Sequence, residues 1–313
     1  MLQRYAEIAH QGYSESLDLA SELRESVQRF IEEPGEESLA SAKAAWIAAR
    51  EPYLQTEVFR FYDGPIDNEE TGPEGRINAW PLDENYIDYT VDEPAQGIIN
   101  DPDGFPQLTK QVLAELNERN GEKNIATGYH AVEFLLWGQD LDPDGPGARP
   151  FTDYVTTGGG TNANQDRRAQ YLNLSADLLT DDLSLVVDAW RLDGDTYAAD
   201  FVRLPAQEGL GRILTGMGAL SGAELSGERM LPAHDNQDQE DEHSCFSDTT
   251  HRDMYLDAVG IQNVYLGRYA GTDGPGVDEL LAERDPQLAQ QLAEEIQTSI
   301  DRIEQIPVPF DAA

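Results

Sequence analysis

The chain has 313 residues, of which 39% are hydrophobic and 8% aromatic, which is enough for a hydrophobic core and excludes wholesale disorder. Its 60 Asp and Glu residues against 21 Lys and Arg residues give a formal net charge of −39. This charge excludes nucleic acid as a partner, because such binding relies on clustered Lys and Arg, and it argues against adhesion to anionic membranes. The acidic composition favours adaptation to saline surroundings, where salt screens the repulsion between carboxylates.

Apolar residues spaced three or four apart predict an all-α chain. In chain order, the expected helices cover residues 5–31, 38–49 with a continuation over 53–61 beyond Pro52, 108–116, 127–137, 168–190, 210–220, 251–269 and 286–306. Residues 63–106 and 140–164 are rich in Gly, Pro, Asp and Asn, which predicts long irregular loops. No apolar run reaches the length of about 18 residues that a membrane-spanning helix needs.

A weak internal similarity between two parts of the sequence predicts two helical halves. Residues 128–141 form a His-bearing segment that precedes a loop and a long helix, and residues 240–269 do the same before the last helix. We therefore expect two four-helix-bundle-like halves, 1–195 and 196–313, that together form one domain. The identity between the halves is too low to establish a duplication.

The placement of histidines is the clearest indication of function. His130 and Glu133 lie three residues apart on an expected helix, so their side chains share one face. One imidazole and one carboxylate that project together suit iron, zinc or manganese. The alternative is a polar pair that satisfies its own hydrogen bonds inside an apolar helix.

A second candidate segment is denser in potential metal ligands. Residues 240–251 contain Glu240, His243, Asp248 and His251. The alternative here is an acidic solvated loop in which Asp248 caps the helix that follows. Capping explains Asp248 but leaves both histidines unexplained.

Two further carboxylates are weaker candidates. Glu57 follows the helix disturbed by Pro52, which would direct its side chain inward, and Glu228 precedes Arg229 in a segment with several glycines. A structural ion pair explains either residue equally well. The sequence contains no His-Glu-x-x-His motif, no Gly-x-Ser-x-Gly elbow and no phosphate-binding loop, so other familiar chemistries find no support.

Several of these segments together resemble one known family. Residues 128–140 resemble the Gly-x-His-x-x-Glu signature of the imelysin family, and residues 220–230 resemble a second segment of that family. Residues 241–251 are similar to the subgroup called iron-regulated protein A. The same subgroup is suggested by residues 63–67, 77–81 and 86–89. The resemblance covers roughly residues 5–306.

The resemblance implies two helical bundles about a pseudo-twofold axis, with the site near their junction. It also implies an exported protein, periplasmic or lipid-anchored, that serves bacterial iron uptake together with other uptake proteins at the membrane. Residues 1–5 lack the pattern of a signal peptide, so we expect that a leader has been removed. Nothing in the sequence predicts an oligomeric state.

Three hypotheses for function remain, and the first is favoured. In the first, the protein binds iron as Fe²⁺ or Fe³⁺. Its candidate ligands are His130, Glu133, Glu57, Glu228, Glu240, His243, Asp248 and His251. In the second, it is a zinc-dependent metallopeptidase in which His130 holds the metal and Glu133 or Glu228 is the general base, although a catalytic zinc normally has three protein ligands. In the third, it is a structural or binding module without metal. If histidines hold the metal, their ordinary pKa of about 6.5 predicts that affinity falls below about pH 6.

Overall fold

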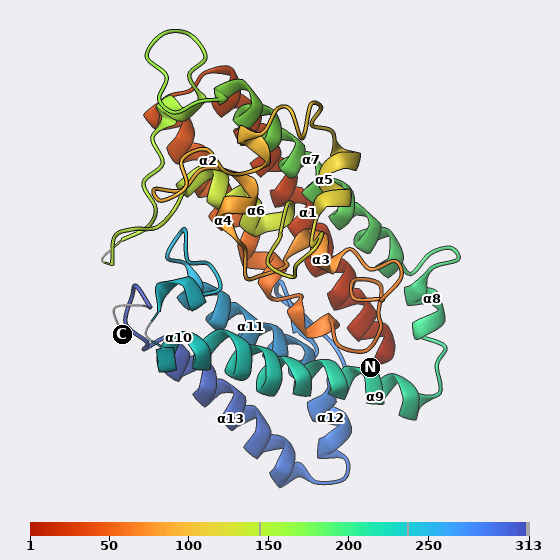
Figure 1. Cartoon of the computed structure of the whole chain (residues 1–313). Coiled ribbons are helices and arrows are strands. Elements are labelled where there is room, and N and C mark those ends of the chain that lie inside the picture. The colour runs from red at the N-terminus through yellow and green to blue at the C-terminus, as the bar shows by residue number, and fades with distance from the viewer. Residues whose placement is uncertain (144, 237, 311–313) are drawn as a thin grey trace.

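Long helices dominate the computed structural model, which describes residues 1–143, 145–236 and 238–310 (Figure 1). The first group of helices contains α1 (Leu2–Glu32), α2 (Glu36–Leu54), α5 (Lys110–Leu116), α6 (Gly128–Trp137) and α7 (Gln165–Trp190). Within this group α1 packs on α2 and α7, and α6 packs on the same two helices. The all-α prediction is confirmed.

The second group of helices lies beside the first, from teal to blue in Figure 1. It contains α9 (Ala206–Ala219), the π-helix η4 (Leu220–Met230), α10 (Leu231–Asn236), α11 (Thr250–Leu266), α12 (Val277–Ala282) and α13 (Pro286–Ile303). Helix α11 joins the groups, because it contacts α12, α13 and η4 on one side and α2 on the other. The predicted boundary at residue 195 falls in the connection between α7 and α8 (Tyr197–Phe201), and the division into two halves stays a prediction.

Short elements occupy the segments predicted to be irregular. They are α3 (Glu74–Ile77), α4 (Glu84–Ile87) and the 3₁₀ turns η2 (Ile98–Asn100) and η3 (Phe151–Tyr154). Elsewhere the chain adds the 3₁₀ turns η1 (Glu57–Phe59) and η5 (Gln239–Asp241) and the strands β1 (Arg268–Tyr269) and β2 (Thr272–Asp273). The two strands pair in antiparallel register, with Arg268 opposite Asp273.

Two expectations about helix continuity are corrected. Helix α2 runs through Pro52 to Leu54, because a proline so close to the end of a helix removes only one hydrogen bond of the last turn. No helix then continues over residues 55–61, where only η1 forms. In the second group, the helix expected to end near residue 220 passes directly into the π-helix η4.

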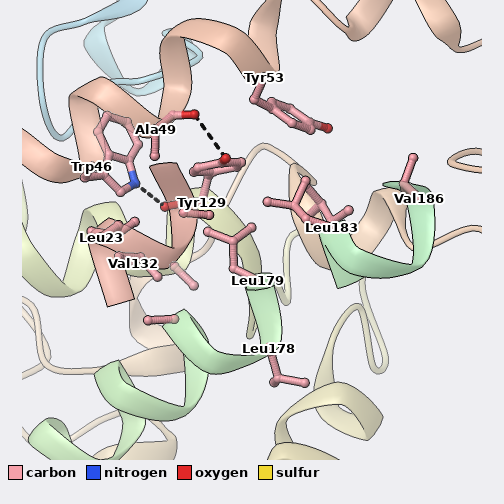
Figure 2. Close-up of a cluster of buried hydrophobic side chains, with 14 of the residues drawn as sticks. Leu23, Trp46, Ala49, Tyr53, Tyr129, Val132, Leu178, Leu179, Leu183 and Val186 are labelled. Carbon is pink, nitrogen blue, oxygen red and sulfur yellow. Dashed lines mark hydrogen bonds between the residues drawn. The ribbon is translucent and has the colours of Figure 1, made fainter. Parts of the chain in front are cut away.

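Helix α6 is held at the centre of the first group, with all ten of its residues buried. The indole Nε1 of Trp46 donates to the Tyr129 carbonyl at 2.9 Å, and the Tyr129 hydroxyl donates to the Ala49 carbonyl at 3.2 Å (Figure 2). Leu179 and Leu183 of α7 belong to the same buried cluster. These contacts hold α6 against α2 and thereby fix the orientation of His130, which follows Tyr129 in the chain.

A buried ionic cluster fastens the irregular segments to α7. Arg168 binds Asp88 through Nε and Nη2, at 2.6 and 3.0 Å, and Arg149 donates to Asp88 at 2.8 Å and to Asp153 at 3.3 Å. All four side chains are at most 1% exposed. We call Asp88, Arg149, Asp153 and Arg168 the anchor cluster.

Candidate metal centre

Two histidines from distant parts of the sequence lie side by side in the interior. His130 comes from the first turn of α6, and His243 comes from the segment that precedes α11. Their ring centroids are 4.7 Å apart with an angle of 72° between the rings, and the two residues are only 1% and 2% exposed. The structure therefore joins the two segments that the sequence singled out separately.

Two glycines allow the backbones to approach closely enough for this arrangement. Gly128 has φ +87°, and a Cβ there would lie 2.6 Å from the Ile77 carbonyl, so the glycine of the Gly-x-His-x-x-Glu motif lets α6 begin against that loop. A Cβ on Gly260 would lie 2.6 Å from the Gln55 carbonyl, so this glycine lets α11 pack directly on the end of α2. The approach at Gly260 brings the two helix groups together, and the approach at Gly128 sets where α6, and with it His130, begins.

Glu133 orients the His130 ring. Its Oε2 lies 2.9 Å from His130 Nδ1, and its Oε1 accepts hydrogen bonds from the Ser247 amide and hydroxyl at 2.9 and 2.7 Å. Burial raises the pKa of Glu133 to about 8, although the hydrogen bonds from Ser247 act in the opposite direction. His130 Nε2 is buried without a hydrogen-bond partner among the described residues.

Asp253 orients the His243 ring in the same way. Its Oδ2 lies 2.6 Å from His243 Nδ1 and also accepts from the Ser244 hydroxyl at 2.5 Å and from Arg50 Nη2 at 3.3 Å. Burial alone would raise the pKa of Asp253, but Arg50 and His243 outweigh it and hold the pKa well below its usual range. Because an ionised carboxylate only accepts hydrogen bonds, His243 Nδ1 must carry the proton, which leaves the Nε2 lone pair free for a metal.

Both imidazoles are neutral at physiological pH. Burial, followed by the charge of Arg229, lowers the pKa of His243 to about 4. Burial and the neighbouring His243 also lower the pKa of His130 well below its usual value. The expectation that metal affinity falls below about pH 6 used the ordinary pKa of histidine, and the lowered pKa values of these buried rings move the expected loss of affinity to a lower pH.

A third group of buried charges adjoins the histidines. Arg229 of η4 donates to Glu57 Oε2 and to Asp257 Oδ2, both at 2.6 Å, and all three side chains are at most 1% exposed. Burial would raise the pKa of Glu57, but Arg60 and Arg229 outweigh it and hold the pKa at about 2. We define the junction cluster as Arg50, Glu57, His130, Glu133, Arg229, His243, Asp253 and Asp257.

The other predicted ligands lie outside this buried cluster. Glu228 and Glu240 are exposed, although their neighbours in sequence include buried residues. Asp248 and His251 are half-buried beside the start of α11. The N-cap of α11 is Thr249 and not Asp248, which has φ +55° and therefore lies outside the helix start.

Sequence reasoning missed Asp253 and Asp257 and considered Arg229 only as a neighbour of Glu228 in a structural ion pair. The two aspartates lie four residues apart on α11, so their side chains share one face of the helix. Both are fully buried, with an exposed fraction of 0%. Two acidic residues at helical spacing among Met254, Leu256 and Ala258 were the available signal. Arg50 gave no signal of its own.

The arrangement suits a metal held by imidazoles better than it suits a zinc peptidase. A catalytic zinc site needs three protein ligands and an open position. In the part of the chain that the structure describes, no group of three or more His, Cys, Asp or Glu side chains is placed to hold one ion. The guanidinium of Arg50, 3.5 Å from His243 Nδ1, also disfavours an additional cation at that face of the ring.

Comparisons with known proteins agree with the fold. The family model for imelysin matches residues 9–313. Iron-regulated protein A of Synechococcus elongatus is 25% identical over 303 residues, covering 93% of this chain and 71% of the relative. A crystal structure from Parabacteroides distasonis, named there as an iron-regulated protein A precursor, superposes with a TM-score of 0.71 at 19% identity and covers 99% of this chain and 87% of its own. An imelysin-like protein from Psychrobacter arcticum gives a TM-score of 0.69 at 14% identity, with 100% and 85% covered. The chain belongs to the imelysin family.

Proposed function

We propose that this protein is an extracytoplasmic iron-binding protein of bacterial iron acquisition, and that it holds an iron ion through Nε2 of His130 and Nε2 of His243. One observation carries the proposal: each imidazole has its Nδ1 tied to a buried carboxyl group, Glu133 at 2.9 Å and Asp253 at 2.6 Å. Because burial raises the pKa of Glu133 to about 8, metal binding at Nε2 of His130 should release the proton of Glu133 and leave the remaining proton on Nδ1. Carboxylate–histidine pairs of this kind fix the ring and increase its basicity in metalloproteins. Under this proposal Glu133 positions His130 and is not itself the first ligand.

The separation of the two rings supports a shared ion. Metal–nitrogen bonds of about 2.1 Å at angles of 90–110° place two imidazole centroids about 4.5–5.2 Å apart. The observed separation of 4.7 Å lies inside this range. The neutral state of both rings is the state that binds metals, because a protonated imidazole has no lone pair to donate.

The name of the relative from Synechococcus supports iron as the metal. Imidazole also accepts zinc, copper and nickel, so the ligand type alone does not select iron. The family favours an extracytoplasmic location, and no helix in the described residues is long and apolar enough to cross a membrane. We propose that iron held at the junction is passed to other uptake proteins at the membrane.

Calorimetric titration with Fe²⁺ under anaerobic conditions tests the proposal. His130→Ala and His243→Ala should each weaken binding at least about tenfold, since even the loss of an outer-sphere partner often costs that much. His234→Ala is the matched control, because the His234 side chain is 77% exposed and lies outside the junction cluster. Binding that survives in both junction variants, or that falls equally in the control, would overturn the proposal.

A further inference from the structure

Arg229 lies between two buried carboxylates that a metal ion in its place could also bind. Its two terminal nitrogens each donate to a different buried carboxylate, Glu57 and Asp257, and Nη2 also reaches Glu224 at 3.1 Å. Glu57 comes from η1, which follows α2 in the chain, and Asp257 comes from α11. A single cation therefore links two segments that lie 200 residues apart in the chain.

Arg229 leaves this carboxylate pair incompletely satisfied. Glu57 Oε1 and Asp257 Oδ1 are buried without a hydrogen-bond partner among the described residues, and so is Nε of Arg229 itself. A buried carboxylate oxygen without a partner is unusual in a native protein and requires an explanation. A metal ion can contact both oxygens of a carboxylate, which the guanidinium does not do here.

The charges around Arg229 are also unbalanced. Arg60 pairs with Glu57, Glu74 and Glu224, and Arg229 pairs with Glu57, Glu224 and Asp257. Four carboxyl groups thus face two guanidiniums, and full ionisation of all four would leave a formal charge of −2. Burial opposes this ionisation, because it raises the pKa of Asp257 well above its usual value and also raises the pKa of Glu74. One divalent cation in place of a guanidinium would favour the ionised form of these carboxyl groups and offset its charge.

The element that carries Arg229 has an unusual geometry. It is an 11-residue π-helix, whereas π-helices are rare and mostly single turns at functional sites. One face of η4 is open at Gly222, where a Cβ would meet no atom within 4 Å, while Leu220, Leu225 and Arg229 of the same element are buried. Conversion of η4 to α-helical geometry would rotate its last turn and carry Arg229 away from Glu57 and Asp257.

We propose that Glu57 and Asp257 form a second cation site beside the histidine pair, which Arg229 fills as an internal counter-cation until a multivalent metal ion replaces it. The proposal extends the iron-binding function proposed above and rests on it for the identity of the natural ion. Asp253 and Asp257 are one helical turn apart, about 6 Å along the axis, so ions at the two sites would be neighbours. The second site has carboxylate oxygens as ligands and therefore prefers a hard cation, such as Fe³⁺ or Mn²⁺.

Mn²⁺ titration of the full chain, followed by electron paramagnetic resonance and calorimetry, tests this second site. The wild type should bind two ions. Glu57→Gln and Asp257→Asn, which preserve shape, should each remove one ion and leave the ion that depends on His130 and His243. Arg229→Gln should bind the second ion at least about tenfold more tightly, because a buried like charge a few ångströms away no longer opposes it.

Arg252→Gln is the matched control, since Arg252 also forms an ion pair, with Glu51, but both partners are more than one third exposed. It should leave both affinities unchanged. Two results would overturn the second site: one ion in the wild type that only the histidine variants remove, or Arg229→Gln with unchanged or weaker binding in folded protein. An ion that depends on Glu57 and Asp257 but not on either histidine would instead refute the iron site proposed above and leave the second site standing. If Arg229→Gln does not fold, the ion counts of the two carboxylate variants decide.

Discussion

The anchor cluster and the junction cluster are built from the same kinds of residue at the same depth, but their carboxylates differ. Each cluster holds an arginine whose Nε is buried without a hydrogen-bond partner among the described residues, Arg149 in the first and Arg229 in the second. Only in the anchor cluster are all carboxylate oxygens hydrogen-bonded. In the anchor cluster, Asp88 accepts from Arg149, Arg168 and Asn100, so that both of its oxygens are bonded. Asp153 accepts from Tyr89 and Arg149 on one oxygen and from Thr161 and Asn162 on the other. Two carboxylates there face two guanidiniums.

The junction cluster has unpartnered atoms in each of its parts. His130 Nε2, Glu57 Oε1, Asp253 Oδ1 and Asp257 Oδ1 are all buried without a hydrogen-bond partner among the described residues. The contrast shows that a buried charge alone does not mark a functional site. Buried carboxylate oxygens without a partner are a more specific sign, because leaving an acceptor unsatisfied lowers the stability of a purely structural cluster.

The largest expected effect lies in the anchor cluster. Asp88→Ala removes the carboxylate that neutralises Arg149 and Arg168, and an uncompensated buried charge typically costs about 3–5 kcal/mol. Urea unfolding should therefore show a large loss of free energy of unfolding. Asp181→Ala is the control, because the Asp181–Lys110 pair is about half exposed and its removal should change stability by less than about 1 kcal/mol. Equal losses in the two variants would remove the structural role assigned to the anchor cluster.

The second largest effect is expected in the junction cluster, where variants of His130 and His243 should change metal affinity more than stability. If His130 and His243 share one ion, the losses of the two single variants should not add in the double variant, and the coupling should exceed about 0.5 kcal/mol. Calorimetric titration of the wild type, both single variants and the double variant measures it. Additive losses would place the two histidines in separate sites, and no loss for His243 would return residues 240–251 to the alternative of a solvated loop.

The sequence predicts those parts of the site that are specified by residues close to one another in the chain. The pair His130 and Glu133 follows from helical spacing, and His243 follows from its density of potential ligands. Glu57 was also expected to point inward, and it is fully buried. The fold class follows from apolar periodicity for the same reason, because helices are specified by residues three and four apart.

The remaining features depend on contacts between distant segments. Arg50 reaches His243 and Asp253 only because Gly260 lets α11 pack on α2, and no local pattern encodes that approach. Glu228 looked like a ligand on local grounds, but it is exposed, whereas its neighbour Arg229 is 1% exposed. The geometry of the π-helix decides which of the two points inward, and the sequence pattern did not predict a π-helix.

The pH dependence of stability should also separate the two clusters. Burial raises the pKa of Glu133 to about 8 from an ordinary value of 4.5, so between these pH values the folded state binds more protons than the unfolded state. Its contribution to the free energy of unfolding therefore decreases as pH rises from about 4.5 to 8. Glu57, with a pKa of about 2, acts in the opposite sense: its contribution is present above about pH 4.5 and is lost as pH falls towards 2. The anchor carboxylate Asp88, whose pKa is lowered by Arg149 and Arg168 against the effect of burial, contributes only to the loss in acid.

Urea unfolding of metal-free protein across this range measures the effect. Glu133→Gln should flatten the decrease between pH 5 and 8, because the glutamine does not titrate. Glu283→Gln, at an exposed position of the second helix group, should leave the profile as in the wild type. A Glu133→Gln profile as steep as that of the wild type would show that Glu133 is ionised throughout and that its pairing with His130 resembles an ordinary ion pair.

The smallest expected effect is spectroscopic. The Trp80 indole packs edge-on against the His243 ring, with centroids 5.6 Å apart and an angle of 74°, and Trp80 is half-buried. A metal ion on His243 changes the charge next to this indole, so Fe²⁺ should change the tryptophan fluorescence with the same midpoint that calorimetry gives. The other three tryptophans, Trp46, Trp137 and Trp190, are buried in the first helix group.

Trp80→Phe should remove most of this fluorescence change while leaving the affinity within about twofold, since a substitution at a partly exposed position that donates no metal ligand usually changes a free energy by about 0.5 kcal/mol or less. His243→Ala should remove both the signal and the binding, which separates the reporter from the ligand. A full signal in Trp80→Phe would mean that the ion binds nearer another tryptophan. Trp46 would then be the first candidate, because the Arg50 guanidinium lies 5.6 Å from its ring and connects it to the junction cluster. That outcome would move the bound ion from the His243 side of the cluster towards α2, and it would leave the anchor cluster as the only one of the two whose role is explained.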